Sequence, residues 1–175
     1  MKKQGFTLIE LMVVIVIMGI LAAVAVPKLF GMIAKSKASE VGPAAGEYVK
    51  LQDAFIAESG DQMGTFTDIG YEIGDASNET TDFTYSTAIT AKGDIAQTEN
   101  AWKAAAKSGL NNCASGAWSL QLDPSSTGNG AAWTASVSSD DCKALTPRFG
   151  DLSRGTAATG GNGGQQGGQQ AGGNG

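Results

Sequence analysis

One carboxylate precedes a long apolar segment near the start of this chain of 175 residues. Glu10 is followed by a stretch from Leu11 to Pro27 that has no charged side chain and consists mainly of Leu, Met, Val, Ile and Ala. A carboxylate at the centre of a membrane-spanning helix costs about 2.5–3.5 kcal/mol on insertion scales. We therefore treat Glu10 as a candidate functional residue.

The apolar segment has the length of a membrane-spanning helix. Phe6 to Val26 would form about 31 Å of helix at about 1.5 Å per residue, which is enough to cross a hydrocarbon core. Lys2 and Lys3 precede it, and the positive-inside rule then favours a cytoplasmic N-terminus. An ordinary secretory signal peptide, cleaved after the small residues 23–25, is the alternative. Glu10 would interrupt the apolar region of such a signal, and the helical pattern continues past it.

The first 30 residues resemble the N-terminus of type IV pilins and pseudopilins. They contain a short basic leader, a glycine, a phenylalanine and then a glutamate four residues further on, in the order Met1-Lys2-Lys3-Gln4-Gly5-Phe6-Thr7-Leu8-Ile9-Glu10. The resemblance implies that a prepilin peptidase removes residues 1–5 by cutting between Gly5 and Phe6. It also implies that the new amine of Phe6 is methylated.

The same resemblance implies a structural role. Residues 6–27 would first hold the subunit in the inner membrane as a single span, and would later form the core of a homo-oligomeric helical filament built by inner-membrane machinery. Glu10 would pair with the Phe6 amine of a neighbour and set the axial register; an acid hydrated among lipid headgroups is the alternative. Gly19 and Pro27 match the positions between which the pilin helix loses regular structure in filaments. A cell-surface pilus for adhesion, motility or DNA uptake is expected, with a pseudopilin of a type II secretion system as the alternative.

An apolar stripe at helical spacing continues the helix beyond the membrane segment. Its members are Phe30, Ile33, Val41, Ala44, Tyr48, Leu51 and Phe55, with charged residues between them. A helix with one apolar face needs a sheet or other helices against that face. We therefore expect an α+β fold, in which this helix packs on a small antiparallel sheet within a head of residues 28–154. Pro27 and Pro43 are expected to kink the helix, and Ser59-Gly60 to end it.

Residues after Gly60 have the composition of a small sheet. Residues 65–73 and 80–91 are expected to form strands or a connecting loop, and 98–107 a short helix. Residues 117–122 and 131–137 alternate apolar and polar side chains around a turn at 123–130, which predicts a β-hairpin. Trp118 and Trp133 are expected to face the helix as core residues; an exposed sugar-binding strip is the alternative.

Two cysteines, Cys113 and Cys142, are expected to form one disulfide in an exported protein, with two buried free thiols as the alternative. Pilins similarly often have a disulfide near the C-terminus. Residues 155–175 contain ten glycines and no charge apart from the chain end, and we expect a disordered tail there.

The composition points away from several classes of function. The chain has no histidine and no recognisable catalytic or phosphate-binding motif, so neither an enzyme nor a cofactor is expected. A net charge of −5 does not favour nucleic acid as a specific partner. The acids between residues 61 and 82 are expected to be solvated and not to bind a metal, although calcium binding, as in secretion pseudopilins, is an alternative.

Overall fold

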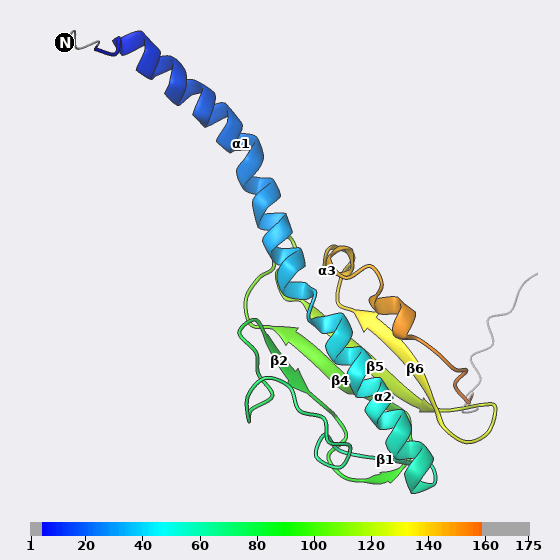
Figure 1. Cartoon of the computed structure of the whole chain (residues 1–175). Helices are drawn as coiled ribbons and strands as arrows, with labels where there is room; N and C mark the ends of the chain where they lie inside the picture. The colour runs from blue at the N-terminus through cyan, green and yellow to red at the C-terminus, as the bar shows by residue number, and fades with distance from the viewer. Residues whose placement is uncertain (1–4, 159–175) are drawn as a thin grey trace, which may run out of the picture.

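The computed structural model describes residues 5–158, which form a long helix that projects from a small α+β head (Figure 1). The elements in chain order are α1 (Leu8–Ala38), α2 (Val41–Ser59), β1 (Gln62–Met63), β2 (Phe83–Ser86), β3 (Gly93–Asp94), β4 (Thr98–Ala106), β5 (Ala117–Pro124), β6 (Ala131–Val137), α3 (Asp140–Leu145) and the 3-10 helix η1 (Phe149–Leu152). The expected fold class, a long N-terminal helix packed on a small antiparallel sheet, is confirmed.

The N-terminal helix is interrupted at Ser39 and Glu40, between α1 and α2. The helix continues through Pro27. A kink was also expected at Pro43, and the interruption lies about one turn before Pro43. Pro43 has no N–H, and a proline ring crowds the carbonyl four residues before it, which here belongs to Ser39. The interruption therefore falls where the missing hydrogen bond would have ended.

The apolar face of α2 lies against the sheet, as the stripe predicted. Val41, Ala44 and Tyr48 are buried, and Leu51 and Phe55 pack partly buried at the margin of the core. The stripe residues of α1, Phe30 and Ile33, are instead exposed. The helix ends as expected at Gly60, whose φ of 72° is a left-handed conformation that glycine adopts without strain.

Four antiparallel strands form the main sheet in the order β2-β4-β5-β6, and β1 pairs separately with β3. The predicted hairpin is confirmed: β5 and β6 pair in a regular register from Trp118 opposite Val137 to Pro124 opposite Ala131. Side chains along β5 alternate between the core and the outer face, so Trp118, Leu120 and Leu122 share the buried side. This alternation is the pattern that identified the hairpin in the sequence.

The prediction of a short helix at residues 98–107 is wrong, because strand β4 occupies this segment in the interior of the sheet. Its alanines favour a helix in isolation, but β4 bonds to β2 on one side and β5 on the other. Ala101, Trp102 and Ala104 are buried there. Helix propensity is worth tenths of a kcal/mol per residue, and pairing on both edges outweighs it.

Aromatic side chains fill the core between α2 and the sheet. Trp118 and Trp133 are 0% and 2% exposed, which confirms them as core residues and rules out the alternative of an exposed strip. The ring of Trp133 meets Tyr48 of α2 edge-on at 5.8 Å between centroids, and Trp118 meets Phe83 of β2 in the same way at 5.6 Å. Such edge-to-face pairs stabilise a core by about 0.5–1.5 kcal/mol beyond area burial.

Both outer strands of the sheet are bonded along their outer edges. Trp133 of β6 exchanges backbone hydrogen bonds with Arg154, and Ala158 N–H donates to the carbonyl of Pro124. On the other side, Tyr85 N–H of β2 donates to Asn78. Residues 155–158 are thus ordered against the hairpin, so the tail predicted to be disordered from residue 155 does not begin there. The rest of that prediction, at 159–175, lies outside the described residues.

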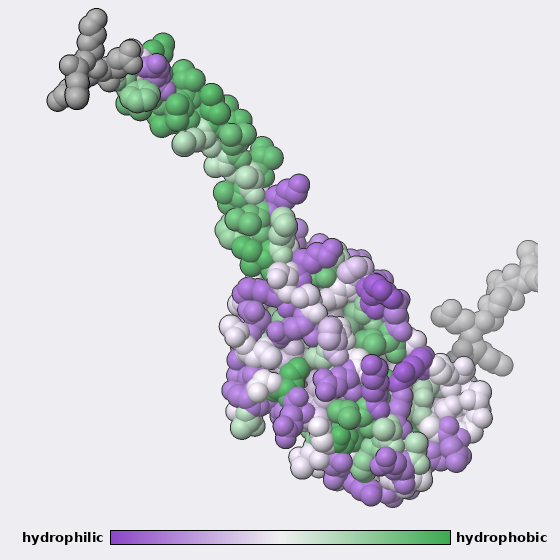
Figure 2. All heavy atoms as spheres, in the orientation of Figure 1, coloured by the Kyte–Doolittle hydropathy of each residue, from purple (hydrophilic) through white to green (hydrophobic). Residues whose placement is uncertain are grey.

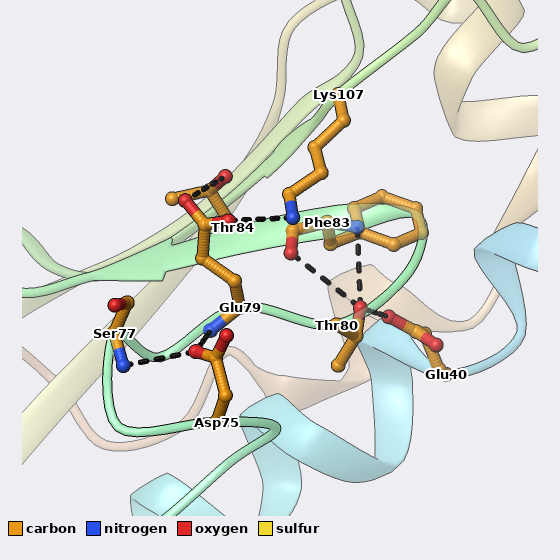
Figure 3. A network of polar contacts seen from close by, with 8 residues as sticks. All are labelled: Glu40, Asp75, Ser77, Glu79, Thr80, Phe83, Thr84 and Lys107. Carbon is orange, nitrogen blue, oxygen red and sulfur yellow. Dashed lines mark hydrogen bonds and ion pairs between the residues drawn. The ribbon is translucent and has the colours of Figure 1, made fainter.

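The loop before β2 holds the junction between α1 and α2 (Figure 3). Glu40 Oε1 accepts hydrogen bonds of 2.6 Å from Thr80 Oγ1 and 2.8 Å from Tyr85 Oη. Lys37 Nζ lies 2.6 Å from Asp82 Oδ1, and Lys107 Nζ of the segment after β4 lies 2.6 Å from Glu79 Oε2. These contacts fix the base of the long helix on the head.

Candidate functional site: the exposed N-terminal helix

The N-terminal part of α1 presents apolar side chains to solvent, and Figure 2 shows them along the visible face of the helix. Its large apolar residues from Phe6 to Ile33 are between 43% and 83% exposed, and burial begins only at Ala34. The helix is long and apolar enough to cross a membrane, with a mean hydropathy of 2.9 over its best window. A contiguous exposed apolar surface of this size marks a site that binds lipid or another protein. We call residues 6–33 the shaft.

Glu10 caps the first turn of the shaft. Its Oε2 accepts hydrogen bonds from the backbone N–H of Thr7 at 2.8 Å and from Thr7 Oγ1 at 2.7 Å. Thr7 Oγ1 in turn accepts from the backbone N–H of Glu10 at 3.3 Å. This reciprocal pair is a capping box, which satisfies two of the N–H groups that a helix start leaves free.

Thr7 is a residue whose role the sequence reasoning missed. The signal was present, because a threonine followed three positions later by glutamate before an apolar run is the sequence pattern of a capping box. Glu10 was singled out for its charge alone. The structure shows that it also has a local partner within the same chain, so its carboxylate does not stand isolated at the start of α1.

The bond between Gly5 and Phe6 lies just before the helix, in exposed chain. A Cβ added at Gly5 would meet no atom within 4 Å, so packing of this chain does not require glycine there. The same is true of Gly19 inside α1. Helix α1 continues through both Gly19 and Pro27.

Cys113, before β5, and Cys142, after β6, form a disulfide with 4.9 Å between their Cα atoms. Both are buried, and Cys142 lies in the short helix α3 that follows β6. Gly116 passes close by: a Cβ there would lie 2.7 Å from Cys113 Sγ and 2.7 Å from the ring of Trp118. The disulfide therefore encloses the β5–β6 hairpin and lies against the core.

The acids of the loop after α2 do not gather into a metal site in the part of the chain that the structure describes. Asp75 Oδ1 accepts from the backbone N–H groups of Ser77 and Glu79, and Glu79 pairs with Lys107 (Figure 3). These carboxylates are used in local turns and ion pairs.

The shaft overlaps a segment that matches a known protein family model. Residues 1–26 match the family model described as the prokaryotic N-terminal methylation motif. The motif covers the Gly5-Phe6 bond, Thr7 and Glu10, and it ends just before Pro27.

Relatives that resemble this chain over more residues than the methylation motif include a type IV pilin and fimbrial proteins. The chain is 40% identical over 73 residues to the type IV major pilin protein PilA of Myxococcus xanthus, covering 42% of this chain and 31% of the relative. It is 38% identical over 98 residues to a fimbrial protein of Dichelobacter nodosus, covering 53% and 61%. A type IV major fimbrial protein FimA of the same species is 51% identical over 45 residues, covering 26% and 29%.

The matched part of these relatives is limited. The chain spans between 29% and 61% of the length of these three proteins. No solved structure matches the chain. The methylation motif thus lies on the shaft, and the match to the fimbrial protein reaches further than the shaft, since it covers 98 residues.

Proposed function

We propose that this chain is the structural subunit of a type IV pilus-like surface filament, assembled through packing of its shaft. The observation that carries the proposal is the exposure of apolar side chains all around residues 6–33. A membrane can cover this surface before assembly, and the shafts of other subunits can cover it afterwards. The resemblance to pilins of two species supports the same role.

Processing at Gly5-Phe6 is part of the proposal. A prepilin peptidase would remove residues 1–5 and methylate Phe6, leaving 6–27 as membrane span and filament core and 28–154 as the head. The bond lies in exposed chain before the cap, where a protease can bind it in extended form. The intact mass of the mature protein should correspond to a chain that begins at Phe6 and has one added methyl group. A chain that begins at Val26 would establish an ordinary signal peptide.

Glu10 is proposed to set the register between subunits. After cleavage the amine of Phe6 lies four residues before it, and a neighbour's amine can approach the same carboxylate in the filament. A buried ion pair adds little net stability, but a buried charge without its partner is strongly destabilising. The pair therefore favours the arrangement in which both charges are in contact. The Thr7 cap can persist in this pairing, because Thr7 holds only Oε2 and the other carboxylate oxygen can accept from the amine.

The deciding experiment expresses Glu10→Val as the only copy of the subunit and measures sheared surface filaments. We expect membrane insertion and cleavage before Phe6 to be unchanged and the filament yield to fall sharply. Glu10→Gln tests the charge separately, because it keeps the acceptor for Thr7 and removes the ion pair. Glu58→Val, at an exposed position of α2, is the matched control and should assemble normally. Normal yield from Glu10→Val would show that the carboxylate is dispensable.

The pseudopilin of a type II secretion system is the second candidate. The names of the matched relatives are those of pilus and fimbrial proteins, which favours the surface filament. Finding this chain as the main component of filaments sheared from cells would support the pilus. Its absence from them, together with loss of protein secretion when the gene is deleted, would support the pseudopilin.

A further inference from the structure

The tip of the β5–β6 hairpin contains an asparagine followed by glycine. Asn129 is exposed, and Gly130 has a φ of 107°, a conformation that residues with a side chain rarely adopt. The absence of a side chain on Gly130 also leaves its backbone nitrogen open to the amide carbon of Asn129. Asn129 and Gly130 line a cleft open to solvent together with Asp61. The side-chain amide of Asn129 and the backbone nitrogen of Gly130 therefore lie in a cleft that water can enter.

A carboxylate from a distant part of the chain holds this nitrogen. The backbone N–H of Gly130 donates a hydrogen bond of 2.9 Å to Oδ1 of Asp61, which is 69 residues away. Asp61 follows α2 directly and is itself anchored, because its carbonyl accepts from the N–H of Ile95 at 3.2 Å and its N–H donates to Ile56 at 3.1 Å. The acceptor is thus fixed by the helix end and by the segment after β3.

We propose that Asn129-Gly130 is a covalent modification site, at which succinimide formation is held back by Asp61. In the reaction the nitrogen of Gly130 forms a bond to Cγ of Asn129 and loses its proton. The Cγ–Nδ2 bond breaks, and the amide nitrogen leaves as ammonia. Water then opens the ring at one of its two carbonyls and leaves aspartate or isoaspartate at position 129. No redox partner is needed, and water is the sole co-reactant.

Asp61 opposes the first step in two ways. The nitrogen must turn toward Cγ and give up its proton, and the hydrogen bond to Asp61 holds both nitrogen and proton in place. The negative charge of the carboxylate also disfavours the amide anion through which the attack proceeds. A hydrogen bond to a charged acceptor is stronger than a neutral one, so its loss should raise the rate about tenfold.

Conversion would alter the hairpin tip in a defined way. Either product adds a negative charge to a cleft that Asp53 and Asp61 already line, and isoaspartate also adds one atom to the backbone. The turn is closed by a 3.0 Å hydrogen bond from the N–H of Ser125 to the carbonyl of Gly130, adjacent to the modified bond. We therefore expect isoaspartate to open the turn. This inference does not depend on the proposed filament function.

The test follows the mass of the peptide that contains position 129, in full-length protein kept in detergent micelles at mildly alkaline pH. Rates are divided by that of the Asn162-Gly163 pair in the same digest, which corrects for differences between samples. We expect native wild-type protein to convert at position 129 about tenfold more slowly than the same protein in urea. Equal rates in the two conditions would overturn the proposal.

Two substitutions locate the effect in Asp61. Asp61→Gly removes the carboxylate and tolerates the local φ of 64°, so the native rate should rise about tenfold. Asp61→Asn keeps an oxygen acceptor without the charge and should give an intermediate rate. The matched control is Asp94→Asn, because Asp94 is an exposed acid of β3 in a cleft that also includes Gly130; its rate should equal that of wild type. No increase in Asp61→Gly, or an equal increase in Asp94→Asn, would contradict the role of Asp61.

Discussion

The indole Nε1 of Trp133 donates a 2.8 Å hydrogen bond to Oδ1 of Asp53, joining strand β6 to helix α2. The other oxygen of the same carboxylate pairs with the guanidinium of Arg154, from the segment that lies along the edge of β6. One side chain therefore connects the helix, the sheet and the C-terminal segment. Trp133 is almost fully buried, so its N–H has no access to water as a substitute partner.

Asp53→Ala should lower the free energy of unfolding of the head by about 1–3 kcal/mol, because the indole N–H of Trp133 would remain buried without an acceptor. Urea denaturation of a head fragment of residues 28–158 measures the change. Glu58→Ala, an exposed position on the same helix, should stay within about 0.5 kcal/mol of wild type. Equal stability of the two variants would show that the Asp53 contacts contribute nothing.

The disulfide should stabilise the head by about 3–4 kcal/mol in the chain-entropy model, since it closes a loop with a sequence separation of 29. Cys142→Ser should lower the melting temperature of the fragment, and adding a reductant to wild type should lower it by the same amount. The reductant should leave Cys142→Ser unchanged. If the reductant lowered the melting temperature of both proteins equally, its effect would come from elsewhere.

The Thr7 cap should be separable from the charge of Glu10. Thr7→Val removes the hydroxyl and should weaken the first turn of α1 by about 1 kcal/mol, whereas Thr7→Ser keeps the acceptor and should resemble wild type. Hydrogen exchange of the amides of residues 8–10 in detergent micelles measures the difference. Identical exchange in Thr7→Val and wild type would mean that the cap is not formed in the micelle-bound subunit.

The junction between α1 and α2 should depend on Glu40. Glu40→Ala leaves the hydroxyl of Tyr85 without its acceptor, whereas the hydroxyl of Thr80 keeps the carbonyl of Phe83 at 3.4 Å, and the substitution should cost about 1–3 kcal/mol. Tyr85→Phe removes one of those donors, and a double-mutant cycle should show that the two substitutions are not additive. Glu47→Ala, an exposed acid of α2, serves as the control. Additive effects would place Tyr85 outside the Glu40 contact.

Buried tyrosines should make the head unstable at alkaline pH. Burial raises the pKa of Tyr71 to about 12 and also raises the pKa values of Tyr48 and Tyr85, from an ordinary value of 10.0. Below pH 10.0 both folded and unfolded chains hold these protons. Above it the unfolded chain loses them first, so stability falls as the pH rises toward the folded pKa.

Urea denaturation between about pH 9 and 11 should therefore show a loss of about 4 kcal/mol, because each of the three tyrosines contributes about 1.4 kcal/mol. Tyr71→Phe should reduce the slope of this loss, because one of the three groups no longer titrates. That variant also gives up the 3.0 Å hydrogen bond from Trp102 Nε1 to Tyr71 Oη and should start from lower stability at neutral pH. A stability that does not vary over this pH range would contradict the burial argument.

Local patterns predicted the elements whose structure is decided locally. Alternation around a turn of Gly, Ser and Asn was enough for the β5–β6 hairpin, and Gly60 marked the end of α2. Strand β4 was mistaken for a helix because its alanines say nothing about the two neighbours that pair with it. The order of residues 155–158 was missed for the same reason, since it depends on bonds to Pro124 and Trp133.

The candidate site was predicted more completely than the head. The shaft is a continuous segment whose apolar composition can be read directly, and Glu10 stands out within it. The Thr7 cap was within reach of the sequence, because it spans three positions. Contacts such as Arg154 with Asp53, separated by 101 residues, depend on the folded arrangement of three elements and leave no trace in spacing or composition.

The covered outer edges of the sheet have a consequence for a protein that would work at high local density. Subunits gathered along a filament bring many heads side by side, and an open strand edge on each would invite strand exchange between them. Arg154 N–H and C=O already occupy the outer groups of Trp133, and the carbonyl of Asn78 already accepts from the N–H of Tyr85. If heads crowd together in a filament, these occupied edges would disfavour their fusion into a continuous sheet.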